Sequence, residues 1–210
     1  MTSILIEDLT SELAIQAEDP EERFITDGVT WEEYENLLEK LGDSLAYRVT
    51  YLDGTLEIMS PSRRHEFDKK NISRLLEIYL EEKRIPFWGL GSTTFRQEQK
   101  RGGTEPDECY CIGTEKEFPD LAIEVVVSSG GINKLAVYQR LGVKEVWFWR
   151  NNKIDVYHLR EENYEQIAKS ELFPELDLNL LVYYAAQPSP LEAILAFRAA
   201  LGQQSNYTND

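Results

Sequence analysis

The run from Leu121 to Val127 is apolar except for one carboxylate, Glu124. A continuous apolar and β-branched run of this length is typical of a strand that is buried on both faces of a sheet. An ionised carboxylate inside such a strand costs several kcal/mol unless a charged group compensates for it. A divalent cation is a compensating group that also performs chemistry, so the run predicts a central strand that carries a metal ligand.

The strand and the residues after it define two faces and a turn. Side chains alternate across a sheet, so the run should divide between its faces. One face would hold Asp120, Ala122, Glu124 and Val126, and the other would hold Leu121, Ile123, Val125 and Val127. The Gly130-Gly131 pair permits a sharp turn into a helix that begins near Ile132 or Asn133. Lys134 then lies in the first helical turn, where a cation opposes the helix dipole, so its position favours a role other than helix stability.

A second strand-like segment begins with an acid. Asp107 stands in the phrase Glu105-Pro106-Asp107-Glu108 and leads into an expected strand that reaches Ile112. Two acids from neighbouring strands, Asp107 and Glu124, together with Lys134 would form a metal site with an electrophilic helper. These three residues are the smallest set that could hydrolyse a phosphodiester bond.

These motifs resemble those of a known nuclease superfamily. Pro106-Asp107, followed after sixteen residues by Glu124-Val125-Val126, is similar to the PD-(D/E)XK pattern. The closer resemblance is to its branch of bacterial restriction endonucleases, the Uma-two family, and covers roughly Thr30 to Phe197. It also rests on the phrases Pro119-Asp120-Leu121-Ala122-Ile123-Glu124-Val125, Asn133-Lys134-Leu135 and Leu141-Gly142-Val143-Lys144-Glu145-Val146-Trp147.

The resemblance implies a restriction-endonuclease-like core, a Mg²⁺ or Mn²⁺ cofactor and a DNA substrate. In the superfamily the lysine stands two residues after the glutamate, where this chain has Val126. The Uma-two branch supplies the lysine from the following helix, which points to Lys134. The resemblance also implies a third carboxylate near the start of a long helix, for which Glu66 is the candidate. The implied metal ligands are therefore Asp107, Glu124 and Glu66.

The start of that long helix leaves alternatives open. Glu66 is also an ordinary acid of a first helical turn, where the helix dipole favours a negative charge. The neighbouring His65 either contacts the substrate or lies on the surface at the helix end, and we favour the surface.

Local signals indicate an α/β fold with a mixed central sheet, flanking helices and additional β-hairpins. Thr30 and Glu33 form a capping-box pattern, and Asp53-Gly54 and Asn151-Asn152 mark hairpin turns. Helices are expected at about 31–41, 64–83, 133–141 and 190–201. Strands are expected at about 46–50, 55–59, 86–90, 93–97, 109–112, 146–149, 154–159 and 161–168, with an irregular segment at 173–181. The polar turn at 99–103 is either a solvated loop, which we favour, or a phosphate contact.

The composition suits one globular domain with two polar extensions. Hydrophobic residues make up 42% and aromatic residues 11% of the 210 residues, enough for a substantial core. We expect the domain at 28–201, an acidic N-terminal arm at 1–27 and a disordered tail at 202–210. Cys109 and Cys111 should be reduced, because two cysteines at that spacing in one strand are poorly placed for a disulfide. No apolar run reaches the length of a membrane span and no secretory signal is present, so we expect a cytoplasmic protein without a membrane partner.

Two functions of different class follow. The first is a Mg²⁺-dependent endonuclease that cuts DNA with Glu66, Asp107, Glu124 and Lys134. The second is a non-catalytic or regulatory protein that keeps the nuclease fold. A net charge of −16 argues against an extended DNA-binding surface and, with Val126, favours the second. Three acids and a lysine at suitable spacings favour the first. The aromatic strand at 146–149 and the acidic arm also suggest a homodimer.

Overall fold

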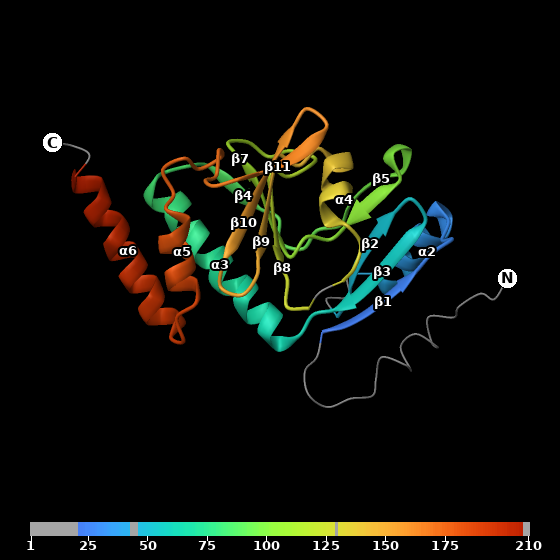
Figure 1. Ribbon diagram of the computed structural model, residues 1–210, viewed down its shortest axis with the longest axis horizontal. Helices are drawn as coiled ribbons and strands as arrows, with labels where there is room; N and C mark the ends of the chain where they lie inside the picture. The colour runs from blue at the N-terminus through green and yellow to red at the C-terminus, as the bar shows by residue number, and fades with distance from the viewer. Residues whose placement is uncertain (1–20, 43–45, 129, 208–210) are drawn as a thin grey trace.

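The computed structural model describes residues 21–42, 46–128 and 130–207, with side chains up to residue 203. Figure 1 shows two β-sheets side by side, helix α4 between them, and helices α5 and α6 at the C-terminal end. Most of the arm expected at 1–27 lies outside the described residues. Within the described residues, no helix combines the length and apolar character that crossing a membrane requires.

The central sheet carries the strand with Glu124. Its strands lie in the order β11 (Asn163–Ile167), β10 (Ile154–Arg160), β9 (Glu145–Trp149), β8 (Leu121–Val125), β7 (Glu108–Ile112) and β4 (Phe87–Gly89). Strands β8 and β9 are parallel and are joined through α4 (Lys134–Leu141), whereas the other neighbours are antiparallel. The expected α/β class with a mixed central sheet and an added hairpin is therefore confirmed.

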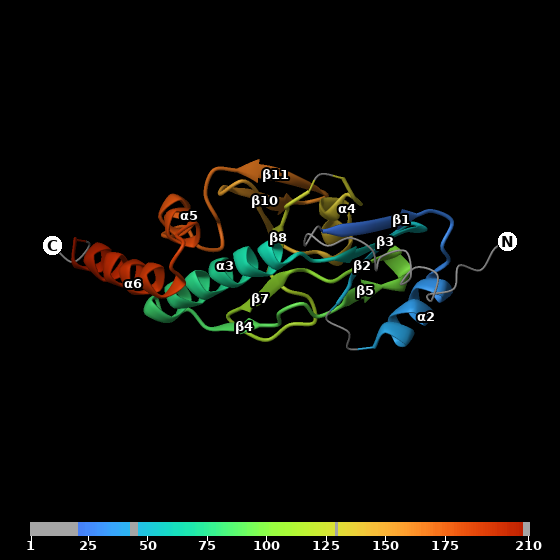
Figure 2. The ribbon, with the colours of Figure 1, turned by 90° about the horizontal axis from the view of Figure 1, so that it is seen from below.

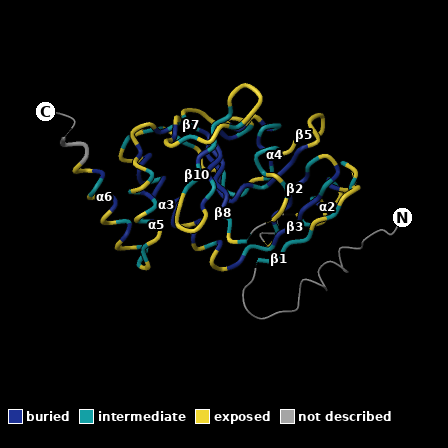
Figure 3. The backbone as a smooth tube through the Cα atoms, in the orientation of Figure 1, coloured by how far each residue is buried: buried dark blue, intermediate teal, exposed yellow. Residues whose placement is uncertain are grey.

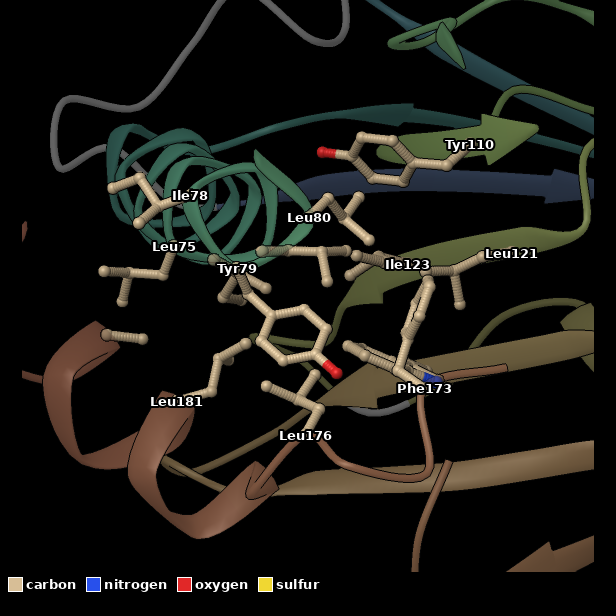
Figure 4. Close-up of a cluster of buried hydrophobic side chains, with 14 of the residues drawn as sticks. Leu75, Ile78, Tyr79, Leu80, Tyr110, Leu121, Ile123, Phe173, Leu176 and Leu181 are labelled. Carbon is tan, nitrogen blue, oxygen red and sulfur yellow. The ribbon is translucent and has the colours of Figure 1, made fainter. Parts of the chain in front are cut away.

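Helices cover both faces of the central sheet. Helix α3 (Arg63–Glu82), with α5 (Leu178–Ala185) and α6 (Pro190–Tyr207), packs on the face that carries Leu121 and Ile123 (Figure 4). Helix α4 packs its Tyr138 and Leu141 with Ala122 on the opposite face. Because side chains alternate, Glu124 shares the α4 face with Ala122.

The outer sheet was not predicted as a separate layer. Its strands lie in the order β1 (Glu22–Thr26), β3 (Thr55–Ser60), β2 (Arg48–Leu52), β6 (Gly102–Thr104) and β5 (Phe95–Gln97), all antiparallel. Helix α2 (Trp31–Leu41) begins with the predicted Thr30–Glu33 capping box and stacks Tyr34 on Tyr51, with ring centroids 4.9 Å apart. Helix α4 contacts β2, β5 and β6 and so joins the two sheets (Figure 2).

The middle strands of the central sheet are deeply buried. Strand β8 is buried along its whole length (Figure 3). Trp147 and Trp149 of β9 are also buried, so they belong to the sheet core and do not present a surface for a partner. The homodimer stays a prediction. Cys109 and Cys111 are buried and free, as expected.

Several expectations about local structure were wrong, because strand pairing or helix capping outweighs the amino-acid composition of the segment. Glu22–Thr26 pairs with β3 as an edge strand and is not a loose arm. Residues 102–104 form β6 after the short 3₁₀ turn η1 (Glu98–Lys100), and Leu178–Ala185 is helical because Asp177 caps its first turn. Helix α6 continues to Tyr207, past the expected start of a disordered tail, and residues 208–210 lie outside the described residues.

Candidate active site

Asp107 and Glu124 lie on adjacent strands of the central sheet. Asp107 directly precedes β7, and its Oδ2 accepts a hydrogen bond of 2.7 Å from the backbone N–H of Val125. Both carboxylates are almost fully buried, with Asp107 1% exposed and Glu124 5% exposed. The structure therefore brings these two predicted acids together inside the sheet.

Glu124 is held by side chains of α4. Its Oε1 accepts a hydrogen bond from the Tyr138 hydroxyl and lies 3.3 Å from Nζ of Lys134. Burial raises the pKa of Glu124 to about 6, the Lys134 charge opposes the rise and the Asp107 carboxylate adds to it. A nearby positive charge would stabilise the ionised form of a buried carboxyl group whose pKa is raised in this way.

Lys134 connects the acids to the outer sheet. It is the first residue of α4, which is capped by the side chain of Asn133. Besides its contact with Glu124, its Nζ donates a hydrogen bond of 2.9 Å to Thr104 Oγ1 in β6. The lysine predicted on the helix after the glycine turn therefore does reach the central strand.

His65 is the residue that sequence reasoning misplaced. It is fully buried, with Nε2 3.0 Å from Asp107 Oδ2 and 3.8 Å from Glu21 Oε1. Burial opposes protonation, but the neighbouring Asp107 and Glu21 carboxylates outweigh it and raise the pKa of His65. The expectation of a surface residue was wrong. Helical periodicity could have found it, because His65 precedes Ile72 by seven residues and so shares the buried face of α3.

Glu66 does not join the two buried acids. Its carboxylate is 39% exposed and lies 2.5 Å from Lys69 Nζ and 3.6 Å from Arg48 Nη2. The ring of His65 stands between it and Asp107, with Nδ1 4.0 Å from Glu66 Oε1. Across the described ranges, no group of three or more His, Cys, Asp or Glu side chains converges to hold a metal ion. The three-carboxylate set implied by the resemblance is therefore not formed, because two cations already neutralise Glu66.

Two further acids at this place were not predicted. Glu21 precedes β1, and its Oε2 accepts a hydrogen bond from the Ser128 hydroxyl in the loop after β8. Glu105, two residues before Asp107, accepts a hydrogen bond of 3.0 Å from Thr94 Oγ1. Burial raises the pKa of Glu105, although the charges of Arg48 and Lys134 lower it. Glu105 could have been predicted from the sequence, because it belongs to the acidic segment Glu105-Pro106-Asp107-Glu108. No sequence pattern points to Glu21.

Three carboxylate oxygens near His65 lack hydrogen-bond donors, whereas the oxygens of the buried Glu145 have them. Within the described chain, Asp107 Oδ1, Glu66 Oε1 and Glu21 Oε1 are buried without a hydrogen-bond donor. By contrast, the buried Glu145 accepts hydrogen bonds from Trp147, Ser170, Glu171 and Leu172. Glu66 Oε1 and Glu21 Oε1 still face Arg48 and His65 at 3.6–4.0 Å. Because buried polar atoms are normally hydrogen-bonded, the unpartnered Oδ1 of Asp107 indicates a place for an additional positive or donor group.

A cleft opens over Glu124 and Lys134. It has a volume of about 570 Å³ and is bordered by the ends of β8 and β9, the loop before α4, and β1 and β3 of the outer sheet. The residues used below are the following lining side chains: Arg23, Glu124, Lys134, Phe148, Arg150 and Tyr157. A substrate in this cleft would meet Glu124 and Lys134 directly.

The family Uma2, described as "Putative restriction endonuclease", matches residues 31–187, which is most of the chain. The chain belongs to the Uma2 family. The match includes the whole candidate site except Glu21, and with it the four residues that the resemblance selected.

Solved structures give a weaker similarity to this Uma2 chain. One is described as "Crystal structure of a putative nuclease belonging to DUF820" from Anabaena variabilis ATCC 29413. It is 15% identical, with a TM-score of 0.45, and the similarity covers 81% of this chain and 99% of that one. No curated protein matches the chain.

Proposed function

We propose that this Uma2 protein is an endonuclease that hydrolyses phosphodiester bonds of DNA with Mg²⁺, or Mn²⁺ in its place. The observation that carries the proposal is the buried pair Asp107 and Glu124 on adjacent strands, with Glu124 and the neighbouring Lys134 lining one cleft. The family description supports a nuclease. The resemblance supports the DNA substrate, and the two carboxylates beside Lys134 support the metal.

The donor set fits a hard divalent cation. Asp107 Oδ1 is buried without a hydrogen-bond partner among the described residues, and Glu124 borders the cleft. Mg²⁺ takes oxygen ligands and is commonly held by one or two carboxylates, with waters and substrate phosphates as its other ligands. Asp107 and Glu124 would hold the ion, which when bound would activate a water molecule and neutralise charge on the phosphate.

The protein side chains have distinct roles. Lys134 keeps its ammonium beside Glu124 at the cleft, where it would stabilise negative charge that develops on the phosphate. Tyr138 orients the carboxylate of Glu124 through its hydroxyl. Burial would favour the neutral form of Asp107, but His65 and the Val125 N–H lower the pKa of Asp107 and keep it ionised.

Glu66 would act through His65. Glu66 contacts Arg48, Lys69 and Nδ1 of His65. Asp107 contacts Nε2 of His65, so the two carboxylates lie on opposite sides of the imidazole ring. Glu66 is therefore a positioning residue in this proposal and not a metal ligand.

A non-catalytic protein with the same fold is the second candidate. The observation that favours it is that Lys134 already neutralises Glu124 and His65 already pairs with Asp107. Two buried acids with such partners could persist without a cation. The net charge of −16 also favours this candidate.

Circular DNA substrates separate the two candidates, because only an endonuclease opens them. Supercoiled plasmid and circular single-stranded DNA would be incubated with the protein in Mg²⁺, in Mn²⁺ and in EDTA. We expect cutting with metal and none in EDTA. Asp107→Asn and Glu124→Gln should slow cutting about 10³-fold. Lys134→Ala should slow it about 10²-fold, the scale of one lost electrostatic stabiliser, and Lys134→Arg should restore little.

The controls change matched residues outside the site. Lys144→Ala removes another lysine that pairs with a buried acid, at 2.9 Å from Asp120, which directly precedes β8. Glu162→Gln removes an exposed acid at the β10–β11 turn. Both should cut as fast as the parent. The non-catalytic candidate would be favoured if the unsubstituted protein cut neither circular substrate. It would also be favoured if the Asp107→Asn variant cut as fast as the unsubstituted protein.

A further inference from the structure

The cleft over Glu124 has an aromatic wall. Phe148 and Tyr157 line it, are only partly buried, and have ring centroids 5.7 Å apart at an interplanar angle of 84°. In the parallel β8–β9 pair, Phe148 is the register partner of Glu124, so it lies beside that carboxylate on the same face. The neighbours Trp147 and Trp149 point to the opposite face and are buried in the core.

An arginine without an ion pair stands at the end of the same strand. Arg150 follows β9, is exposed, and lines the cleft. No acid of the described residues pairs with it, whereas Arg23 on the other side of the cleft lies near Glu21 and Glu57. The backbone of Arg150 pairs twice with Lys153, at 2.9 and 3.0 Å, which closes a tight turn. The turn therefore presents an uncompensated cation at the cleft rim.

Aromatic faces and a free cation in one groove are the combination that binds unpaired nucleic acid. Bases stack on aromatic rings, and cations follow the phosphate backbone. A base inside a duplex has both of its faces covered by its neighbours, so it can stack on a protein ring only after it leaves the stack. The position of Phe148 next to Glu124 would place a stacked base beside the reacting phosphate.

We infer that the cleft binds a single-stranded segment of the DNA substrate, with a base stacked on Phe148 and Tyr157 and a phosphate on Arg150. The inference rests on the proposed function and specifies its substrate class. It assigns substrate binding to three residues that the sequence motifs do not contain.

The test is equilibrium binding with Ca²⁺ in place of Mg²⁺, measured by fluorescence anisotropy. The probes are a fluorescein-labelled single strand of 2-aminopurine-containing DNA and the same strand in a duplex. We expect the single strand to bind at least about tenfold more tightly than the duplex and its 2-aminopurine emission to be quenched. Phe148→Leu and Tyr157→Leu keep apolar volume but remove the ring, and should weaken single-strand binding about 5-fold to 100-fold and relieve the quenching.

Arg150 is tested through the salt dependence of the same binding. Arg150→Ala should weaken the binding and reduce the slope of log K against log salt by about 0.7, the value for one phosphate contact on a single strand. Matched controls are Tyr183→Leu, a 60% exposed aromatic residue on α5, and Arg84→Ala, an exposed arginine outside the cleft lining. Both controls should bind like the parent, and thermal melting checks that every variant is folded.

Each outcome decides the inference. Preference for the single strand that depends on Phe148, Tyr157 and Arg150 supports it. Equal or tighter binding of the duplex, ring variants that bind like the parent, or no binding of either probe would overturn it. Cutting of circular DNA is measured separately, so a protein that cuts but shows no such preference loses this inference and keeps the proposed function.

Discussion

Asp120 directly precedes β8 and Glu124 lies within it, and these two buried acids meet opposite environments. Asp120 accepts a hydrogen bond of 2.8 Å from the Ile112 N–H and contacts the ammonium groups of Lys116 and Lys144. Burial alone would raise the pKa of Asp120, but these donors outweigh it and lower the pKa. Burial raises the pKa of Glu124 to about 6, because fewer donors oppose it there and the neighbouring Asp107 carboxylate adds to the rise. Environment therefore separates a structural acid from one suited to a cation.

Asp120→Asn should lower the free energy of unfolding by about 1–3 kcal/mol at pH 7, because two lysines and a buried N–H lose a charged acceptor. The pKa of Asp120 is lower in the folded than in the unfolded chain, so its ionised form stabilises the fold above the unfolded value. That contribution is lost as the pH falls through the folded pKa. Urea unfolding between pH 7 and pH 3 should therefore show the difference from the parent shrinking towards low pH. Asp155→Asn, which changes a partly buried acid of β10 that accepts a hydrogen bond from Gln166, is the control. A difference that stays constant with pH would refute the account.

The loop between β8 and α4 sets the distance from Glu124 to Lys134. Two side chains of the outer sheet hold it: Arg23 Nη1 donates to the Gly130 carbonyl at 2.5 Å, and the Ile132 N–H donates to Glu57 Oε2 at 2.7 Å. Gly131 lies directly under these side chains with a φ of +108°, and a Cβ there would collide with both. The outer sheet therefore acts on the site through the shape of this loop.

Gly131→Ala should destabilise the protein and slow cutting more than Gly130→Ala does. Gly130 has nearly the same φ of +107° but nothing within 4 Å of its Cβ position, so it reports the backbone strain alone. We expect about 1 kcal/mol for the strain in either variant, and about 1–3 kcal/mol more for Gly131→Ala because Arg23 and Glu57 must move. Urea unfolding and plasmid cutting would measure both effects. Equal losses in the two variants would show that the contact with the outer sheet is unimportant.

The whole molecule extends past the part that the family match covers. The match ends at residue 187, and α6 follows it from Pro190. Yet Phe197 is fully buried and Leu201 is 3% exposed, both in the core cluster of α3 and the central sheet. Helix α6 therefore completes the layer of helices on one face of that sheet.

A chain that ends at residue 187 should lose about 3–6 kcal/mol of its free energy of unfolding, since burying a Phe and a Leu contributes about 1.5–3 kcal/mol each. This is a large part of the stability of an ordinary domain. A chain that ends at residue 203 keeps both side chains and should match the full chain. Urea unfolding of the three chains is the measurement. Equal stability of the shortest and the full chain would mean that α6 contributes nothing to the core.

The sequence alone determined the elements that have strong local signals. The apolar run of β8, the glycine turn after it and the amphipathic helix that follows place Glu124 and Lys134 on neighbouring elements, because periodicity and turn chemistry act over a few residues. The acidic phrase that leads into β7 placed Asp107 in the same way. The α/β class follows from these local signals, the nuclease family was indicated by the resemblance of the motifs, and both were confirmed.

Only the tertiary structure decided which distant side chains meet. His65 meets Asp107 across 42 positions of sequence, Glu21 reaches Ser128 across 107, and Glu66 pairs with Arg48 of the outer sheet instead of lying beside Asp107 and Glu124. No local pattern encodes such contacts, since they depend on how α3 and the outer sheet dock on the central sheet. The physical reason is that burial makes an unpaired charge costly, so each buried charge takes the partner that packing brings within reach.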